Sequence, residues 1–149
     1  MRFKFTRLAE SFGTSRRIAI KIGCVTLVPG WGDGIVGKFL ALDCAKGRGI
    51  ILPGGKFEPK IDRTYRNAAA RECREETGCE PTDLSYLWHG PDGGKFTTFA
   101  FTGKLFAPRP MVETREGKPL WATRSQLLAS DYAAFYDVMF EMYDRGRSK

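Results

Sequence analysis

The sequence predicts a single mixed α+β domain in which two helices pack on a β-sheet. Runs rich in Ile, Val and Phe alternate with glycine-rich turns before residue 53 and again between residues 84 and 106. One helix is predicted near 64–77 and a second at 130–146. The order strands, helix, strands, helix is typical of this class. The 149 residues, 42% hydrophobic and 28% charged, suit one domain with one sizeable core.

The first half of the chain is predicted to supply several strands. Three runs rich in β-branched and aromatic residues are separated by glycine-rich turns: 16–30, 38–43 and 50–53. Before them, Phe3 and Phe5 alternate with basic and polar residues. We expect residues 1–16 to be an N-terminal extension or an extra strand of one domain that spans 1–149.

The first helix is predicted from about Thr64 to Thr77. Thr64 or Asp62 can cap its start, and Gly78 stands where a left-handed residue ends a helix. Pro59 falls outside this helix, where it does not disturb the hydrogen bonding.

The second half is predicted to complete the sheet and add a helix. Two strands, 84–90 and 97–106, flank a PDGG turn. A long loop (107–119) then leads to a short strand (120–122) and a helical turn (124–129). The final helix is predicted at 130–146, with Ser130 or Asp131 as its cap. The apolar face of the last helix is expected in the core, with a dimer contact as the alternative. A monomer and a homodimer are therefore both open.

The charge balance favours an anionic partner. The chain has 24 Lys and Arg against 17 Asp and Glu, a net charge of +7 and a pI near 9.4. A positive net charge is compatible with binding of a nucleotide, a phosphorylated metabolite or nucleic acid, and it does not distinguish among them. It is also compatible with a charge that only keeps the protein soluble.

Cysteine usage and hydropathy indicate where the protein works. The four cysteines show no C-x-x-C pair, so free thiols in a reducing compartment are predicted rather than a zinc site or a disulfide framework. The basic N-terminus has no apolar core of a secretory signal, and no run approaches the ~18 apolar residues that a membrane span needs. We expect a soluble, cytoplasmic protein with no membrane partner.

Three glutamates share one side of the first helix. At about 100° per residue, Glu72, Glu75 and Glu76 fall within a sector about 100° wide. The same sector holds Ala68 and Ala69, whose small side chains let a helix approach a sheet, whereas most of the arginines lie opposite. Carboxylates on a packed side are costly unless they are paired or bind metal. This favours a Mg²⁺ or Mn²⁺ site over glutamates that merely pair with neighbouring arginines.

A glycine pair before the helix strengthens the case for a metal. Gly54 and Gly55 follow the strand that ends at Pro53 and are predicted to form a turn. Glycines let the backbone approach a ligand closely, so a carbonyl here could add an oxygen to the carboxylates.

These segments resemble the Nudix box of the Nudix hydrolases. The box is G-x5-E-x7-R-E-U-x-E-E-x-G-U, in which U is a bulky apolar residue. LPGG (52–55) and AAARECREETGC (68–79) carry the resemblance. The positions that match in order and spacing are Arg71, Glu72, Cys73, Glu75, Glu76 and Gly78, and Cys79 matches the last position loosely. The resemblance extends over about 19–143, but only the box is specific.

The box departs from the family pattern at its start. Counting back from Arg71, the first Glu of the pattern falls on Arg63 and its Gly falls on Phe57. The glycine pair therefore stands two residues too early, and the loop KFEPKIDRT is longer by two. Either Asp62 or Glu58 could supply the missing carboxylate.

The resemblance implies an α/β/α sandwich with a mixed sheet. It also implies an enzyme that cleaves a P–O–P bond in a nucleoside diphosphate-linked substrate such as a (d)NTP. Glu72, Glu75 and Glu76 would hold Mg²⁺ or Mn²⁺, Glu72 would help to activate water, and Arg71 would orient the glutamates. The carbonyl of Gly54 or Gly55 would be a further ligand.

Other side chains are candidates for the same site. Lys56 and Lys60 flank the glycine pair and could contact phosphate oxygens. In some members of the family a further metal ligand or base lies near the position of Glu113 or Glu116. Trp121 could stack on a base, although core packing is the usual role of strand aromatics. His89 has no evident partner in the sequence.

Two other functions compete with the hydrolase. A non-catalytic nucleotide- or RNA-binding domain on the same fold is suggested by Arg63, the longer loop and the charge of +7. A structural domain would require the glutamates to be spectators. For the enzyme, the substrates that fit are a (d)NTP, a nucleotide sugar, a dinucleoside polyphosphate or a capped RNA end.

Overall fold

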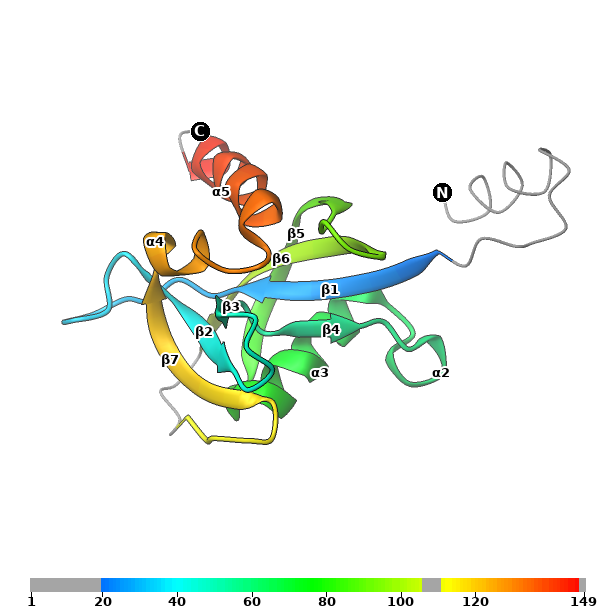
Figure 1. Ribbon diagram of the computed structural model, residues 1–149, viewed down its shortest axis with the longest axis horizontal. Coiled ribbons are helices and arrows are strands. Elements are labelled where there is room, and N and C mark those ends of the chain that lie inside the picture. Colours follow the sequence, from blue (N-terminus) through cyan, green and yellow to red (C-terminus); the bar gives the residue numbers. More distant parts are fainter. Residues whose placement is uncertain (1–19, 106–110, 148–149) are drawn as a thin grey trace, which may run out of the picture.

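A four-stranded mixed sheet forms the centre of the molecule. The computed structural model describes residues 20–105 and 111–147 (Figure 1). The strand order is β4-β1-β6-β5, with bounds Gly54–Lys56, Lys21–Leu27, Phe96–Leu105 and Pro81–Pro91. β1 and β6 run parallel, whereas the two outer pairs are antiparallel. This confirms the predicted mixed sheet.

A second sheet of three antiparallel strands lies beside the first. Its order is β3-β2-β7, with bounds Ile50–Ile51, Lys38–Cys44 and Gly117–Thr123. The chain passes from one sheet to the other after β1, where Pro29 forms a bridge with Phe39 and Val28 accepts the N–H of Leu40 at 3.0 Å.

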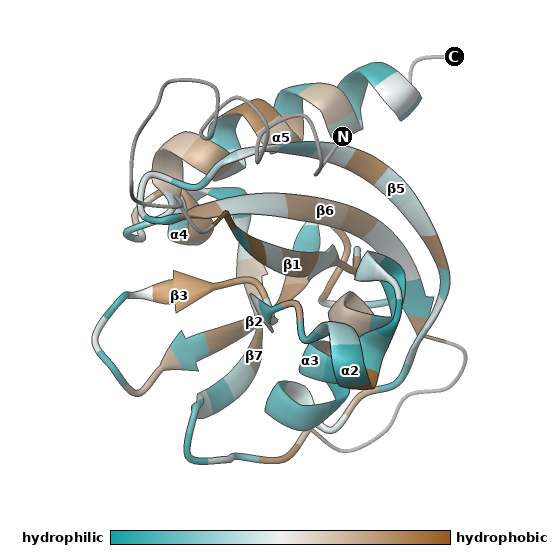
Figure 2. Cartoon of the chain, turned by 90° about the vertical axis from the view of Figure 1, so that its right-hand side faces the viewer, coloured by the Kyte–Doolittle hydropathy of each residue, from teal (hydrophilic) through white to brown (hydrophobic). Residues whose placement is uncertain are grey.

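The two long helices cover opposite faces of the first sheet. α3 (Tyr65–Thr77) packs against β1, β4 and β5, and α5 (Ala133–Arg147) packs over β5. Figure 2 shows α5 on one side of β6 and β1 and α3 on the other. Two short helices, α2 (Pro59–Asp62) and α4 (Arg124–Leu127), complete the fold. The α/β/α arrangement is therefore confirmed.

Local signals explain where α3 begins and ends. The Thr64 hydroxyl accepts the N–H of Asn67, and Gly78 has φ 77° and donates its N–H to the Arg74 carbonyl. Ala68 and Ala69 are fully buried, and the Thr26 hydroxyl of β1 donates to the Ala69 carbonyl at 3.1 Å. The helix is thus fixed closely against the sheet on the side that carries the glutamates.

A buried tyrosine joins α5 to the strand that precedes the glycine pair. The Tyr136 hydroxyl accepts the N–H of Leu52 at 2.8 Å, and both residues belong to the main core. This core also contains Leu27, Phe39, Ala100, Leu127, Phe135 and Met139. The segment from Leu52 to Gly55 is therefore supported from the α5 side as well as from α3.

Two predicted elements differ in the structure. Gly54 and Gly55 are not a turn: they form β4 with Lys56, because a Cβ on Gly54 would meet the Cys24 carbonyl at 2.6 Å and only glycine fits so close to β1. β7 begins at Gly117 rather than at residue 120, since Pro119 is tolerated on the edge strand of the second sheet.

The remaining predictions agree in outline with the described residues. β1 occupies part of the predicted strand 16–30, and the predicted N-terminal extension or extra strand, 1–16, lies outside the described residues. Thr123 and Gln126 form a capping box on α4. In the described part of the chain, no helix is both long and apolar enough to cross a membrane.

Candidate functional site

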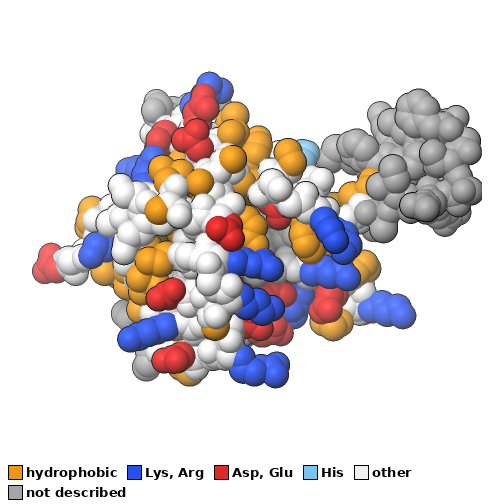
Figure 3. Space-filling model, in the orientation of Figure 1, with side chains coloured by type: hydrophobic (Ala, Val, Ile, Leu, Met, Phe, Trp, Pro, Cys, Tyr) orange, Lys and Arg blue, Asp and Glu red, His pale blue; other side chains and the backbone are white. Residues whose placement is uncertain are grey.

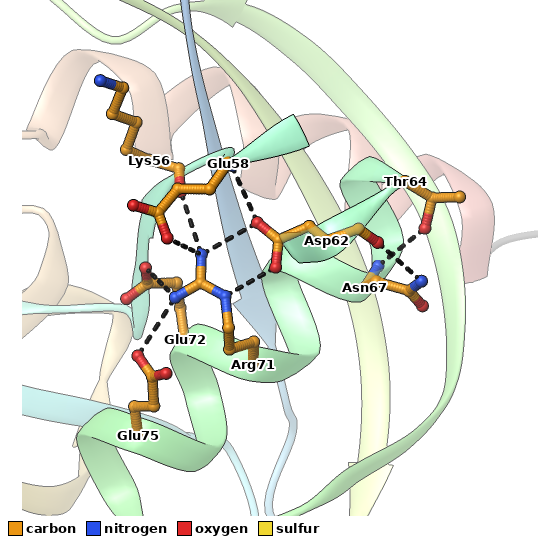
Figure 4. Close-up of polar contacts among 8 residues, drawn as sticks. All are labelled: Lys56, Glu58, Asp62, Thr64, Asn67, Arg71, Glu72 and Glu75. Atoms are coloured by element: carbon orange, nitrogen blue, oxygen red, sulfur yellow. Dashed lines mark hydrogen bonds and ion pairs between the residues drawn. The ribbon is translucent and has the colours of Figure 1, made fainter. Parts of the chain in front are cut away.

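Arg71 lies at the centre of a group of acidic side chains from α3, α2 and the residue before α2 (Figure 4). Its guanidinium donates from Nη1 to Glu72 Oε1 at 2.9 Å and to Glu75 Oε2 at 3.1 Å. From Nη2 it also donates to the carbonyl of Lys56 at 3.2 Å, which connects β4 to the helix. The Arg71 side chain is only 12% exposed. Its fixed fork of donors therefore holds two glutamates and a strand in one geometry.

Asp62 is the principal partner of Arg71. Its carboxylate accepts from Arg71 Nε at 2.6 Å and from Nη2 at 2.9 Å, a bidentate ion pair, and it also accepts the N–H of Glu58 at 2.9 Å. Asp62 is 3% exposed. The hydrogen bonds from Arg71 hold the pKa of the Asp62 carboxyl below its usual value despite its burial, and the same pairing raises the pKa of Arg71.

Arg63 occupies the position where the family pattern would have its first acid, yet it points to solvent. It adopts φ 66° between α2 and α3, and within the described residues it makes no ion pair. The preceding residue, Asp62, is buried instead. Glu58 contributes less: its carboxylate lies 3.6 Å from Arg71 Nη2 and is half-exposed.

Glu76 is the most deeply buried of the three glutamates, at 7% exposed. Its Oε1 accepts the N–H of Gly54 at 2.7 Å. Burial, together with the negative charges of Glu72 and Glu116, raises the pKa of the Glu76 carboxyl to about 8, although the Gly54 hydrogen bond opposes the shift. Among the described residues no cation forms an ion pair with it.

Glu72 rests against the second glycine of the pair. A Cβ added to Gly55 would lie 2.5 to 2.7 Å from the Glu72 carboxylate, so a side chain at residue 55 would displace it. Burial raises the pKa of the Glu72 carboxyl, and Arg71 counteracts part of this effect. Glycine is therefore required here for a close approach between strand and carboxylate.

The donor set fits a hard divalent cation. Glu72 and Glu76 approach adjacent glycines of β4, while the Glu75 side chain, 57% exposed, is turned toward Arg71. In this arrangement no three acidic, His or Cys side chains of the described residues converge closely enough to enclose an ion. Arg71 pairs with Glu72, whereas the ionised form of the buried Glu76 would carry a charge that no described cation compensates. A cation held by carboxylate and carbonyl oxygens would balance this charge.

A pocket of about 190 Å³ opens beside Glu76. β1 and β4 line one side, the β2–β3 turn lines another, and the first turn of α5 closes it. Of the predicted site residues, Gly54, Gly55, Lys56, Glu76 and Glu116 line this pocket. Figure 3 shows Lys and Arg side chains gathered over β4 and α2. A basic rim thus borders an acidic floor.

The other predicted residues lie elsewhere. Lys60 and Glu113 are exposed and do not line the pocket. Trp121 also lies outside it and packs against the cluster of Val28, Leu40, Cys73 and Cys79, because alternation along β7 turns it toward α3.

His89 does have a partner, which the sequence did not reveal. Its Nδ1 lies 2.6 Å from the Tyr86 hydroxyl, and its ring stacks on Phe99 at 4.5 Å. This aromatic group lies outside the pocket lining.

Several pocket residues were not singled out from the sequence: Lys46, Arg48, Asp92, Phe96, Thr98 and Tyr132. They come from two hairpins and from the turn before α5. Arg48 is fixed there, since its Nη1 donates to the Tyr132 hydroxyl at 2.5 Å and its carbonyl accepts the N–H of Asp131. The turn signals at KGRG and PDGG marked the hairpins, but only tertiary pairing brings them together.

Cys44 provides a chemical reporter of this pocket. It is half-buried and lines the pocket, whereas the other three cysteines are fully buried, and burial raises the pKa of Cys24 and of Cys73 to about 12. Iodoacetamide is expected to modify Cys44 first and the others only on unfolding. Peptide mass spectrometry of the native and the denatured protein measures this. Equal labelling of Cys24 and Cys44 in the native protein would contradict the burial pattern.

Comparison with known proteins assigns the family. The model of the NUDIX domain matches residues 35–143, which is most of the chain. The chain belongs to the Nudix family. A comparison with curated protein sequences finds no significant match.

Solved Nudix structures share the fold at low sequence identity. The NUDIX domain of Shewanella oneidensis NrtR, complexed with ADP ribose, is 16% identical, with a TM-score of 0.67 over 95% of this chain and 98% of that one. A Caenorhabditis elegans Ap4A hydrolase is also 16% identical, with a TM-score of 0.66 over 87% and 98%. An ADP-ribose pyrophosphatase from Streptococcus suis is 14% identical, with a TM-score of 0.63 over 83% and 91%.

The Nudix box of this chain is irregular in sequence, but a carboxylate next to the departing position contacts Arg71. The helix carries Arg71 and the three glutamates at the spacing of the box, and of the two candidate acids Asp62 makes the bidentate contact with Arg71. The extra residues of the loop are accommodated in α2 and at Arg63, outside the packed face of α3.

Proposed function

We propose that this Nudix domain is a divalent-metal-dependent pyrophosphohydrolase that cleaves a P–O–P bond in a nucleoside diphosphate-linked substrate such as a (d)NTP. The observation that carries the proposal is the buried Glu76 beside Glu72 and the glycine pair, at the floor of a pocket with a basic rim. Membership of the Nudix family supports a hydrolase that acts on phosphoanhydride bonds.

The box residues have distinct roles in this proposal. Glu72, Glu75 and Glu76 would hold Mg²⁺ or Mn²⁺, together with a carbonyl of Gly54 or Gly55. The bound ion would neutralise phosphate charge and lower the pKa of bound water. Arg71 and Asp62 position the glutamates.

The proposal also needs a base for the attacking water and a contact for the phosphate. Hydrolysis adds water to one phosphorus and breaks its bond to the bridging oxygen, so a nearby carboxylate must accept the proton of the water. Glu72 and Glu116 are the candidates, because Glu116 lines the pocket with Glu76. Lys56 lies on the rim, where its ammonium would contact phosphate oxygens.

The geometry of Asp62 weakens the case for a non-catalytic binding domain. That alternative depended largely on Arg63 at the position of an acid, and Asp62 replaces this acid at Arg71. The net charge of +7 fits a nucleotide substrate as well as it fits RNA. A capped RNA end stays among the candidate substrates.

A substrate panel tests the proposal. Purified protein is incubated with Mg²⁺ or Mn²⁺ and with nucleoside triphosphates, ADP-ribose, a nucleotide sugar, Ap4A and a capped oligonucleotide. We expect cleavage of at least one member at a P–O–P bond, identified by mass spectrometry of the products, and loss of cleavage with EDTA. No turnover of any member with either ion, by a protein that still binds nucleotides, would favour the binding domain.

The setting of the enzyme is part of the proposal. We place it in a reducing compartment such as the cytoplasm, because its four cysteines form no disulfide. A single domain over 1–149, as a monomer or a homodimer, is consistent with the family match over 35–143.

A further inference from the structure

The end of the pocket next to β6 is lined by different side chains from the basic rim. Lys46, Arg48 and Lys56 are exposed cations at the rim, whereas the hairpin between β5 and β6 contributes a carboxylate, a hydroxyl and an aromatic ring. These are Asp92, Thr98 and Phe96, hereafter the hairpin subsite. The pocket, at about 190 Å³, is smaller than the roughly 300 Å³ at which sites for whole drug-sized ligands begin. It can enclose one moiety of a nucleotide and leave the rest at the rim.

The floor that leads to the hairpin subsite is bare backbone. Gly23 of β1 pairs in register with Lys56 on one side and with Thr98 on the other. A Cβ at Gly23 would lie 2.8 Å from Thr98 Oγ1 and 3.6 Å from Phe96 Cδ1. Any side chain at residue 23 would therefore fill the space between β4 and β6. Without one, a flat group can lie on the sheet beside the ring of Phe96.

The spacing suits a nucleotide that spans both ends. Gly54, the partner of Glu76, lies two residues along β4 and two interstrand steps away from Thr98. This separation corresponds to about 12 Å. A phosphate group near Glu76 would thus place an attached nucleoside over Gly23, with its base at the hairpin subsite.

Asp92 has acceptor capacity left for a ligand. Its Oδ1 accepts the N–H of Gly94 at 2.8 Å, which fixes the side chain, and its Oδ2 lies 3.4 Å from Thr98 Oγ1. An ionised carboxylate offers about four acceptor sites and no donor. Within the described residues Asp92 makes no ion pair. Its free lone pairs would therefore meet N–H donors of a ligand, and they would repel a carbonyl oxygen.

We propose that the hairpin subsite recognises a nucleobase that presents an exocyclic amine, with Phe96 stacking on the base and Asp92 accepting from the amine. This inference rests on the proposed function, since it assumes that the phosphates lie toward Glu76 and the basic rim. Adenine and hypoxanthine are the probes: at C6 the first carries an amine and the second a carbonyl oxygen, and N1 carries a proton only in the second.

Binding of AMP and IMP in EDTA tests the inference without turnover. We expect the wild-type protein to bind AMP about tenfold or more tightly than IMP, the effect of one hydrogen bond to a charged group. Asp92→Asn should bring this ratio close to one or invert it, because an amide can donate to a carbonyl oxygen. The amide oxygen still accepts from Gly94, so the hairpin is expected to keep its fold. Titration calorimetry measures both affinities, and protection of Cys44 from alkylation reports pocket occupancy.

Two controls complete the experiment. Asp137→Asn makes the same change on the exposed side of α5, outside the pocket lining, and should leave the ratio as in wild type. Phe96→Ala should weaken AMP and IMP by similar factors, since stacking depends little on which base is bound.

The results separate this inference from the proposed function. A wild-type ratio near one, or a ratio that Asp92→Asn leaves unchanged, would overturn the inference even if the protein hydrolyses nucleotides. A strong AMP preference that depends on Asp92 would support it even if the substrate panel showed no turnover.

Discussion

Replacing Glu76 by glutamine is expected to lower the rate of hydrolysis by at least about 100-fold while the metal-free protein keeps its stability. Metal affinity commonly falls 10- to 100-fold when even a supporting group is lost, and Glu76 is proposed as a direct ligand. The amide oxygen can still accept the N–H of Gly54. Because burial raises the pKa of Glu76 to about 8, its carboxyl is largely neutral in the metal-free protein at pH 7, and the neutral amide of glutamine resembles this form.

Two measurements check this expectation. Steady-state kinetics on the substrate found in the panel give the loss of rate, and thermal unfolding with and without Mg²⁺ shows whether the ion stabilises each protein. We expect Mg²⁺ to raise the melting temperature of wild type but not of Glu76→Gln. Glu80→Gln is the matched control, since Glu80 is exposed in the link between α3 and β5 and pairs only with Arg74 among the described residues. Activity of Glu76→Gln above half of wild type would refute the assignment of Glu76.

Removing the carboxylate of Asp62 is expected to damage both stability and activity. Asp62→Ala leaves a buried guanidinium without its bidentate partner, and breaking a buried pair in this way costs about 3 kcal/mol or more of unfolding free energy. For a domain of this size the melting temperature should fall by roughly 6–12 °C. Catalysis should fall by about 10- to 100-fold, because Arg71 also holds Glu72 and Glu75.

The neighbouring residue provides the control for Asp62. Arg63→Gln changes an exposed side chain at the position that matches the first acid of the family pattern, so its effect on stability should stay within about 0.5 kcal/mol. Thermal unfolding and kcat/KM of both variants show whether Asp62 or Arg63 is the position that stability and catalysis depend on. If Arg63→Gln lowered the melting temperature and kcat/KM as much as Asp62→Ala does, the position in the linear pattern would matter more than the contact with Arg71.

Local features of the chain were predictable because they depend on neighbours in the sequence. The limits of α3 follow from Thr64 and Gly78, and the side that carries the glutamates follows from helical periodicity and the two alanines. The fold class follows from the same patterns. These signals need no knowledge of distant partners.

Features set by distant pairing could not be predicted in the same way. Gly54 and Gly55 resemble a turn, and only their ladder with Cys24 and Val25 makes them a strand. Asp92 and Phe96 reach the pocket because β1 and β6 pair in parallel across a long separation in the chain. Trp121 is a stacking candidate in the sequence, yet it packs against Val28 and Cys73, because alternation along one strand does not say which face of a sheet meets the pocket.

The φ of 66° at Arg63 has a consequence for recognising relatives of this chain. A motif defined by fixed spacing scores position 63 and records a missing acid, although the carboxylate that meets Arg71 is nine residues before it. Homology searches that allow an acidic residue at either of two adjacent offsets, followed by one residue with a left-handed backbone, would recover such chains. In this chain the longer loop still delivers a carboxylate to Arg71, so the contact is kept although the residue count differs.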